Sequence, residues 1–210
     1  MRAAAFILAA GLGTRLRPLT LVRPKPLVPV CGVPLLSYSL ALCARHGLRD
    51  VVVNAHWLAE QLTEWEGEHE GCNVHVVTEL PDILGTGGGL RNVRHLLAER
   101  FVVLNGDILH NLNVSALLAA VPAGGGAMAL RCHPDDARRY GVVAADEAGI
   151  IVELASVARS EAVGDVVRTT HFTGLHALDR TALDLVPDGF ACIVRTAYKS
   201  LVPLRRVVGL

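Results

Sequence analysis

Two cations, Arg15 and Lys25, lie close in the sequence to the glycine-rich segment Gly11-Leu12-Gly13-Thr14. Glycines let an anion approach backbone N–H groups closely, because they carry no side chain and tolerate unusual backbone angles. Prolines on both sides of Lys25 restrict the backbone there, which lowers the entropy lost in presenting its ammonium group. This combination predicts a phosphate-binding loop. The alternative is a tight turn with no ligand.

Asp107 is the candidate metal ligand. It follows Asn105-Gly106 directly after the apolar run 101–104, so a strand that ends there would present its carboxylate beyond the sheet. Mg²⁺ prefers one or two carboxylates together with phosphate oxygens and waters. A turn aspartate that binds its own backbone is the alternative. Beside a phosphate loop, Asp107 predicts a magnesium site.

Two commoner phosphate motifs are excluded. The P-loop string G-x-x-x-x-G-K-[ST] does not occur in the chain. The dinucleotide fingerprint needs a third glycine three residues after Gly13, where this sequence has Leu16. The loop is therefore of another class.

Alternating strands and helices must position these residues. Apolar runs predict strands at 3–9, 50–55, 74–78 and 101–104, and helical spacing predicts helices at 34–46, 57–65, 87–97 and 114–121. This order indicates an α/β fold: a Rossmann-like, doubly wound, mostly parallel sheet with helices on both faces. Ligands of such sheets bind beyond the carboxyl ends of the strands, where the glycine loop and Asp107 both fall.

Shorter strands are expected in the rest of the chain, at 127–131, 141–145, 150–154 and 169–178. No linker or repeat separates them from the first part. We therefore expect one domain over residues 1–210, with 1–125 binding a nucleotide and 126–210 forming a small β extension for a second substrate. The last residues, Val208-Gly209-Leu210, are also expected to form an apolar strand.

Composition narrows the class of protein. Lys and Arg total 20 and Asp and Glu total 20, so no basic excess favours nucleic-acid binding. The chain is 51% hydrophobic, which predicts a large core, yet no apolar run reaches the roughly 18 residues of a membrane span. The N-terminal apolar run lacks the pattern of a signal peptide. Five scattered cysteines without a C-x-x-C motif indicate reduced thiols in a cytoplasmic protein.

The segment from Leu8 to Thr20, closed by Pro24-Lys25-Pro26, resembles the signature of the sugar-phosphate nucleotidyltransferases. This family includes glucose-1-phosphate thymidylyl-, mannose-1-phosphate guanylyl- and N-acetylmuramate-1-phosphate uridylyltransferases, and its fold is GT-A-like. Weaker similarity continues to about Leu178. The resemblance implies catalytic roles for Arg15, Lys25 and Asp107, with Asp107 binding Mg²⁺.

The family resemblance also implies a nucleotide-binding set. Its members are Leu8, Ala9, Ala10, Gly11, Gly13, Thr14, Glu79, Thr86, Gly87 and Gly88. Around Thr86, three glycines would let backbone amides approach a base or ribose and would start a helix with free N–H donors. A flexible connector is the alternative. The Thr-Gly-Gly-Gly form resembles the muramate uridylyltransferases more than the thymidylyl enzymes, and UTP or GTP is the favoured nucleotide.

For the sugar phosphate, the resemblance implies Asn105, Gly141, Glu153, Thr173 and Gly174, with Gly141 preceded by Tyr140. Two departures from the family pattern stand out. Many relatives have Glu-Lys-Pro where this chain reads Glu153-Leu154-Ala155, so the lysine usually placed on the sugar phosphate is absent. A second metal-binding aspartate in a D-x-G-T-like turn is also absent. The chain is therefore expected to be C-terminally truncated or to have an incomplete metal site.

The expected reaction is Mg²⁺-dependent transfer of a nucleotidyl group from an NTP to a sugar 1-phosphate. The products would be pyrophosphate and an NDP-sugar, a precursor of cell walls or polysaccharides. Two alternatives remain: an enzyme like the CTP:phosphocholine cytidylyltransferases, and a regulatory subunit that binds a nucleotide sugar without turnover. The sequence leaves the base, the sugar and the oligomeric state open.

Overall fold

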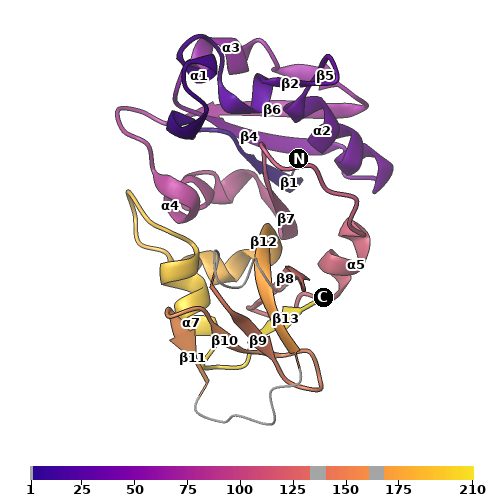
Figure 1. Ribbon diagram of the computed structural model, residues 1–210, viewed down its shortest axis with the longest axis vertical. Helices are drawn as coiled ribbons and strands as arrows, with labels where there is room; N and C mark the ends of the chain where they lie inside the picture. The colour runs from indigo at the N-terminus through magenta and orange to yellow at the C-terminus, as the bar shows by residue number, and fades with distance from the viewer. Residues whose placement is uncertain (1, 133–140, 161–167) are drawn as a thin grey trace.

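The computed structural model describes residues 2–132, 141–160 and 168–210 (Figure 1). One mixed sheet of eleven strands runs through these residues, with a separate two-stranded ribbon. In Figure 1 the N-terminal strands and helices form the upper part and the later strands the lower part. Because the sheet is continuous across both parts, the proposed division near residue 125 falls between neighbouring strands of one sheet. That division stays a prediction.

Four parallel strands form the centre of the upper part. They lie in the order β6-β4-β1-β7, so the chain first winds outward from β1 in one direction and then crosses to its other side. The bounds are Ala3–Leu8 for β1, Asp50–Ala55 for β4, Cys72–Thr78 for β6 and Leu97–Asn105 for β7. The direction of winding changes between β1 and β7, which makes the carboxyl ends of these two strands the expected ligand site.

Strands β1 and β4 and the second half of β7 are apolar because both of their faces are buried. Successive side chains point to opposite faces, so Phe6 and Val52 enter one hydrophobic core, whereas Ile7, Val51 and Val53 enter the other. Helices complete the two cores: α2 (Leu35–Arg45), α3 (Ala59–Thr63) and α5 (Val114–Ala119) on one face and α4 (Gly85–Asn92) on the other. The doubly wound α/β fold expected from the sequence is confirmed.

The lower part is built on one long strand, β12 (Arg168–Asp179), which pairs antiparallel with β7 and joins the two parts. Short strands extend the sheet from it, and the last of them pairs parallel with β8 (Figure 1). They are β8 (Gly126–Arg131), β9 (Val143–Ala145), β10 (Ile151–Leu154), β11 (Ala158–Arg159) and β13 (Val207–Gly209). The expected apolar strand at the end of the sequence is β13.

One element differs clearly from its prediction. The helix expected at 87–97 begins earlier, at Gly85, and ends at Asn92, and β7 already begins at Leu97. Leu97 is buried and pairs with Ala3, but the exposed pair Glu99-Arg100 follows it. These polar residues hide the first half of the strand from a search for apolar runs.

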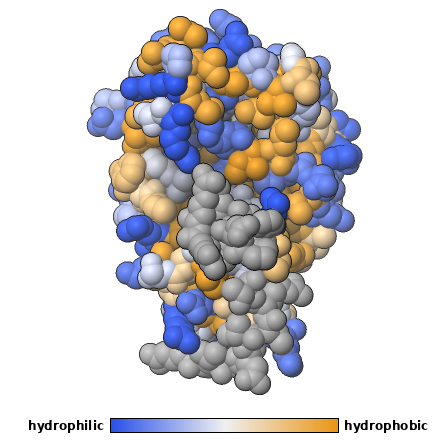
Figure 2. Space-filling model, in the orientation of Figure 1, coloured by the Kyte–Doolittle hydropathy of each residue, from blue (hydrophilic) through white to orange (hydrophobic). Residues whose placement is uncertain are grey.

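Several elements are too short to carry a periodic apolar pattern and were not predicted. They are β2 (Pro29–Val30), β3 (Val33–Pro34), β5 (Gly67–His69), β11, the 3₁₀ turns η1 (Thr14–Leu16), η2 (Lys25–Leu27), η3 (Arg94–Leu96) and η4 (Arg180–Leu185), and the helical segments α1 (Leu19–Val22), η5 (Val194–Tyr198) and α7 (Lys199–Leu201). Figure 2 shows hydrophobic and hydrophilic residues interspersed over the face that it draws, outside the grey atoms.

Candidate active site

A cavity of about 260 Å³, here called the first cavity, opens beyond the carboxyl ends of β1 and β7. This is the point where the direction of winding changes, as the fold predicts. Nine predicted site residues line it: Leu8, Ala9, Ala10, Gly11, Lys25, Glu79, Thr86, Asn105 and Asp107. Pro26, Asn54, Ile83 and Gly85 complete the lining. The structure therefore brings the two polar strand ends to one crevice.

Lys25 and Asp107 form an ion pair in this cavity, although 82 positions separate them in the sequence. Lys25 begins η2, and the extended backbone of Pro24 leads the chain into it. About a quarter of each side chain is exposed, 24% for Lys25 and 26% for Asp107. Because both side chains line the open cavity, a ligand that enters it can reach both charges.

The glycine loop is held by a buried hydroxyl. Gly13 has a positive φ of 62°, and the Thr20 hydroxyl donates to its carbonyl oxygen over 2.7 Å. Trp57 in turn donates its indole N–H to the Thr20 carbonyl over 2.7 Å. Gly11 differs, because a Cβ built on it would meet no protein atom within 4 Å. Gly13 thus shapes the turn, and Gly11 leaves space open at the cavity.

Asn54 is the principal lining residue that the sequence analysis missed. Its side chain accepts from the Ala9 N–H and donates to Glu79 Oε1, both over 2.7 Å, and Glu79 Oε2 accepts from the Leu84 N–H over 2.7 Å. Asn54 is 2% exposed and Glu79 1%. One signal was available, since Asn54 is a polar residue in the otherwise apolar run Val51–Ala55. This network joins the ends of β1, β4 and β6.

The glycines that open α4 pack against the chain itself. The N–H groups of Gly87 and Gly88 both donate to the Ala191 carbonyl oxygen, over 2.8 and 3.3 Å. A Cβ on Gly88 would lie 2.0 Å from the Gly189 carbonyl oxygen. The expectation of free N–H donors at Gly87 and Gly88 is therefore wrong, because the segment around Ala191 already occupies them. Thr86 does line the first cavity.

A second cavity of about 310 Å³ adjoins the first and shares Leu8, Thr86 and Asn105 with it. Thr173 and Gly174 line it, as do Ile108, Phe172, His176, Cys192, Ile193 and Val194. The register of β12 against β8 shifts between Phe172 and His176, so Thr173 and Gly174 lie in an irregularity inside one strand. The structure thus brings three predicted sugar-side residues, Asn105, Thr173 and Gly174, next to the predicted nucleotide residues.

Two histidines near the cavities have a lowered pKa. Burial lowers the pKa of His176 to about 3, and its Nδ1 lies 2.8 Å from the hydroxyl of Tyr198, whose own pKa burial raises well above the usual value. Burial also lowers the pKa of His110, and the nearby Asp107 carboxylate acts in the opposite direction. Both imidazoles are therefore uncharged near neutral pH.

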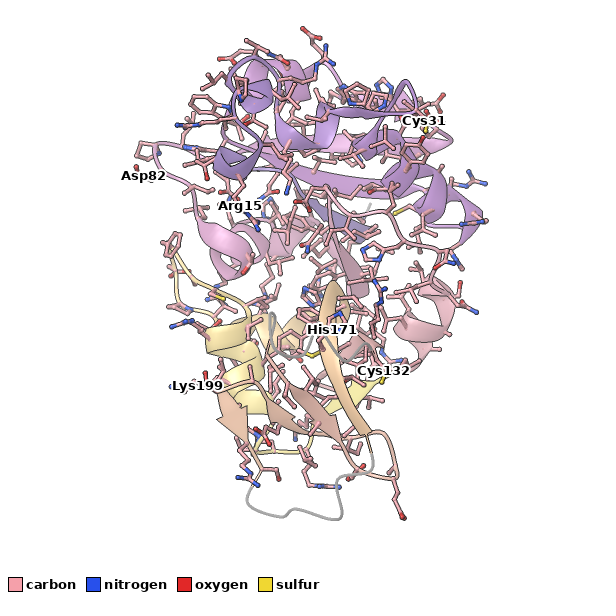
Figure 3. The ribbon with its side chains drawn as sticks, in the orientation of Figure 1. Arg15, Cys31, Asp82, Cys132, His171 and Lys199 are labelled. Atoms are coloured by element: carbon pink, nitrogen blue, oxygen red, sulfur yellow. The ribbon has the colours of Figure 1, made fainter. Side chains whose placement is uncertain are left out.

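The remaining predicted residues lie elsewhere. Thr14 and Arg15 are exposed on η1, outside the lining of both cavities (Figure 3). Glu153 lines a separate hollow with residues 155–159. Gly141 packs close to Ala155, where a Cβ on it would come within 2.9 Å of the Ala155 Cβ. Tyr140 lies outside the described residues. The roles of these residues stay predictions.

Asp107 fits a metal ion only together with a ligand. Among the described residues, no group of three or more His, Cys, Asp or Glu side chains could hold a metal. The other carboxylate of the first cavity, Glu79, already accepts from Asn54 and from the Leu84 N–H. One carboxylate plus phosphate oxygens and waters is nevertheless sufficient for Mg²⁺. The residues present thus fit an ion that arrives with a triphosphate.

Residues 4–156 match the model of the nucleotidyl transferase family. The chain belongs to this family. The four parallel strands apart from Ala3, the whole lining of the first cavity and both charged residues of the ion pair fall within the matched range. Among the described residues, no helix is long and apolar enough to cross a membrane.

Three curated relatives each match half of this chain or more. The chain is 29% identical over 201 residues to a UTP–glucose-1-phosphate uridylyltransferase of Synechocystis, a match that covers 88% of the chain and 51% of the relative. It is 32% identical over 189 residues to a mannose-1-phosphate guanylyltransferase of Mycobacterium tuberculosis, with 88% and 51% covered. An N-acetylmuramate alpha-1-phosphate uridylyltransferase of Neisseria meningitidis is 38% identical over 115 residues, with 53% and 50% covered. The chain thus spans about half the length of these relatives.

A solved structure has the same fold. The crystal structure of HddC from Yersinia pseudotuberculosis complexed with GMP-PN superposes with a TM-score of 0.70, covering 91% of this chain and 83% of that one at 23% identity. At this identity the likeness concerns the fold alone.

Proposed function

We propose that this chain carries the active site of an enzyme that joins an NTP to a sugar 1-phosphate and releases pyrophosphate. The observation that supports this most is the first cavity, where the glycine loop, Lys25 and Asp107 meet at the point where the winding of the sheet changes direction. UTP and GTP are the favoured donors, because the relatives are named as uridylyl- and guanylyltransferases.

The chemistry asks the protein mainly for positioning. An oxygen of the sugar phosphate attacks the α-phosphorus in line, a new P–O bond forms, and the bond to the β-phosphate oxygen breaks. The attacking oxygen is already anionic near neutral pH, so no side chain has to remove a proton. Catalysis then consists of alignment and charge neutralisation.

In this mechanism Lys25 changes partner. Its ammonium pairs with Asp107 in the structure, and we propose that it turns to the α-phosphate and the incoming phosphate when substrates bind. There it offsets the repulsion between the two anions. Arg15 is exposed on η1, and no ion pair to it is present among the described residues. We assign it to the departing pyrophosphate.

Asp107, freed from Lys25, is the residue that would hold Mg²⁺. The ion, when bound with the triphosphate, neutralises charge on the phosphate oxygens. Asp107 is the second residue after the end of β7. The N–H of the intervening Gly106 donates to the Leu8 carbonyl over 3.0 Å, which fixes the distance of Asp107 from the glycine loop. This fixed spacing supports a shared role for the loop and the carboxylate.

We assign one substrate to each of the two cavities. The first has the glycine loop, Glu79 and Thr86, which we assign to the nucleotide, and the second has Thr173 and Gly174, which we assign to the sugar. Asn105 lines both. Its position between them suits a residue at the junction of donor and acceptor.

A second acceptor class has a specific observation in its favour. A CMP-5'-(3-aminopropyl)phosphonate synthase of Streptomyces rubellomurinus is 35% identical over 151 residues, which cover 71% of this chain and 24% of that one. A small phospho- or phosphono-amine joined to CMP is therefore the rival product, as in the phosphocholine alternative raised by the sequence.

The test is pyrophosphate release from each of four NTPs against glucose 1-phosphate, mannose 1-phosphate, N-acetylmuramate 1-phosphate and phosphocholine, with and without Mg²⁺. Release with a sugar 1-phosphate that stops without Mg²⁺ is the expected result. Release with phosphocholine and CTP alone would establish the rival. Nucleotide binding without turnover on the whole panel would overturn the enzyme proposal and favour a regulatory subunit.

We also propose that the protein acts in the cytoplasm. All five cysteines are free thiols in the structure, which suits the reducing cytoplasm where nucleotide sugars are expected to be made. Fractionation of cells that make the protein tests this location.

A further inference from the structure

A third cavity of about 550 Å³ adjoins the second and shares Ile108, Phe172 and Thr173 with it. It does not share a lining residue with the first cavity. Its walls come from the loop after β7, from the end of β8 and from β12. Neither the expected reaction nor the predicted site residues give this cavity a role, apart from Thr173 at its border.

Nitrogen donors from three separate elements line the third cavity: Arg131 on β8, His171 on β12, and His110 with Asn111 on the loop (Figure 3 labels His171). Arg131 and His171 lie directly opposite each other in the antiparallel pair of β8 and β12. Directly opposed residues place their Cβ atoms about 5 Å apart on the same face of the sheet. A guanidinium and an imidazole therefore stand side by side on one wall.

Two of these donors have unused hydrogen-bonding capacity. His110 Nε2 is shielded from solvent and has no hydrogen-bond partner among the described residues. Such a buried atom costs free energy unless something pairs with it. Arg131 is exposed at the rim, and within residues 2–132, 141–160 and 168–210 no hydrogen bond or ion pair to its side chain is present.

No carboxylate balances these groups from within the described lining. Asp107 comes three residues before His110 and is near enough to favour a charge on that imidazole, but it lines the first cavity and pairs with Lys25. A cavity with an arginine, two imidazoles and an amide, and without an acid in its described walls, favours an anion over a cation or a neutral group.

We propose that the third cavity binds a second anionic group of the acceptor, a carboxylate or a phosphate carried elsewhere on the sugar than at C1. The proposal rests on the proposed function. The 1-phosphate has to meet the α-phosphate beside Lys25, in the first cavity, and the sugar then lies in the second. Because the third cavity shares lining residues with the second and none with the first, the group that reaches it is a substituent of the sugar.

The proposal assigns Arg131 as a specificity-determining residue. A charge-assisted hydrogen bond at a partly enclosed site changes affinity on the order of 10- to 100-fold. Acidic acceptors should therefore exceed neutral ones by about that factor in kcat/KM, mostly through KM.

The experiment compares glucose 1-phosphate with glucuronic acid 1-phosphate and glucose 1,6-bisphosphate, using UTP and GTP. The two acidic probes distinguish a carboxylate from a phosphate site. Arg131→Met should lower kcat/KM for the preferred acidic acceptor on the order of 10- to 100-fold more than for glucose 1-phosphate. Arg45→Met, at an exposed arginine of α2 that lines none of the three cavities, is the matched control and should change neither value.

Three outcomes are decisive. Preference for an acidic acceptor that Arg131→Met removes supports the proposal. Equal use of all three acceptors, or an equal loss on all three in Arg131→Met, overturns it while leaving the proposed function intact. If no acceptor is turned over, the proposed function fails, and NMR titration decides the site separately. Shifts of the His110 and His171 imidazole signals with glucose 1,6-bisphosphate, absent with glucose 1-phosphate and in Arg131→Met, would support it, and their absence would overturn it.

Discussion

The two glycine-rich segments of this chain look alike in sequence but face different surroundings. At Gly11 the space that a side chain would fill is open, and it borders the first cavity. At Gly88 the same space holds the carbonyl oxygen of Gly189. A ligand can therefore approach the first segment, whereas the backbone of Gly189 already packs against the second. A glycine shows that something approaches the backbone closely, but not what approaches.

The largest expected effect on activity comes from replacing Lys25, which lies beside the first glycine-rich segment. Lys25→Ala should lower kcat/KM for nucleotidyl transfer roughly 10²- to 10³-fold, because a preorganised charge at the reacting phosphates is lost. Lys199→Ala is the control, since Lys199 is the other lysine of the sequence and is exposed on α7 (Figure 3). Both variants should melt within a few degrees of the parent protein. A Lys25→Ala enzyme with unchanged kcat and KM would falsify the assignment.

The contrast between the two glycines can be tested directly with a pair of alanine substitutions. Gly88→Ala should destabilise the fold by about 3 kcal/mol, because its methyl group overlaps a carbonyl that cannot move away cheaply. Gly11→Ala should change stability by less than about 0.5 kcal/mol but weaken nucleotide binding about tenfold. Urea unfolding and calorimetry with UTP and GTP measure the two quantities. The comparison breaks down if Gly11→Ala proves the less stable variant.

Asn54 supports both segments, since it bonds to Ala9 on one side and to Glu79 on the other. Asn54→Ala should cost about 2–3 kcal/mol of unfolding free energy, because a buried N–H and a buried carboxylate oxygen each lose a partner. Nucleotide affinity should fall as well. Asn92→Ala, at an exposed position of α4, is the matched control and should be close to neutral. Equal stability of the two variants would show that the network does not hold the site together.

Protonation of His176 has a smaller expected effect on stability than the loss of Asn54. His176 lies beside the segment that packs against the second glycine-rich segment. It contacts Tyr198 of η5, and residues 189–193 just before η5 pack against the glycines of α4. Its folded pKa of about 3 lies below the usual 6.5, so the unfolded chain takes up its proton first as the pH falls. Stability is therefore full above pH 6.5 and declines between pH 6.5 and 3. The expected loss from about pH 7.5 to about pH 5 is about 2 kcal/mol.

His176→Gln isolates this contribution. The variant should lose about 2 kcal/mol less than the parent over the same pH interval, in urea unfolding followed by circular dichroism. His95→Gln, at an exposed position, should retain the full pH dependence of the parent. If both variants lose as much unfolding free energy as the parent over this pH interval, His176 is not the cause of the loss of stability in acid.

Strands and helices with strong apolar patterns were predictable, and weakly patterned ones were not. The runs at β1 and β4 are buried on both faces, so their sequences have few polar residues to interrupt them. By contrast, Glu99 and Arg100 lie on β7 and are exposed, and the start of that strand was missed. Tertiary pairing of Leu97 with Ala3, rather than local pattern, makes those residues a strand.

The sequence by itself determined the family, the order of the longer strands and helices, and the placing of the glycine loop and Asp107 after two apolar strands. These signals are local, because a strand end and a turn are written in a few consecutive residues. Only the tertiary structure decided that Lys25 pairs with Asp107, that Asn54 ties Ala9 to Glu79, and that Gly87 and Gly88 bond to Ala191. Those contacts join residues 25 to 104 positions apart, and close packing of the whole chain selects them.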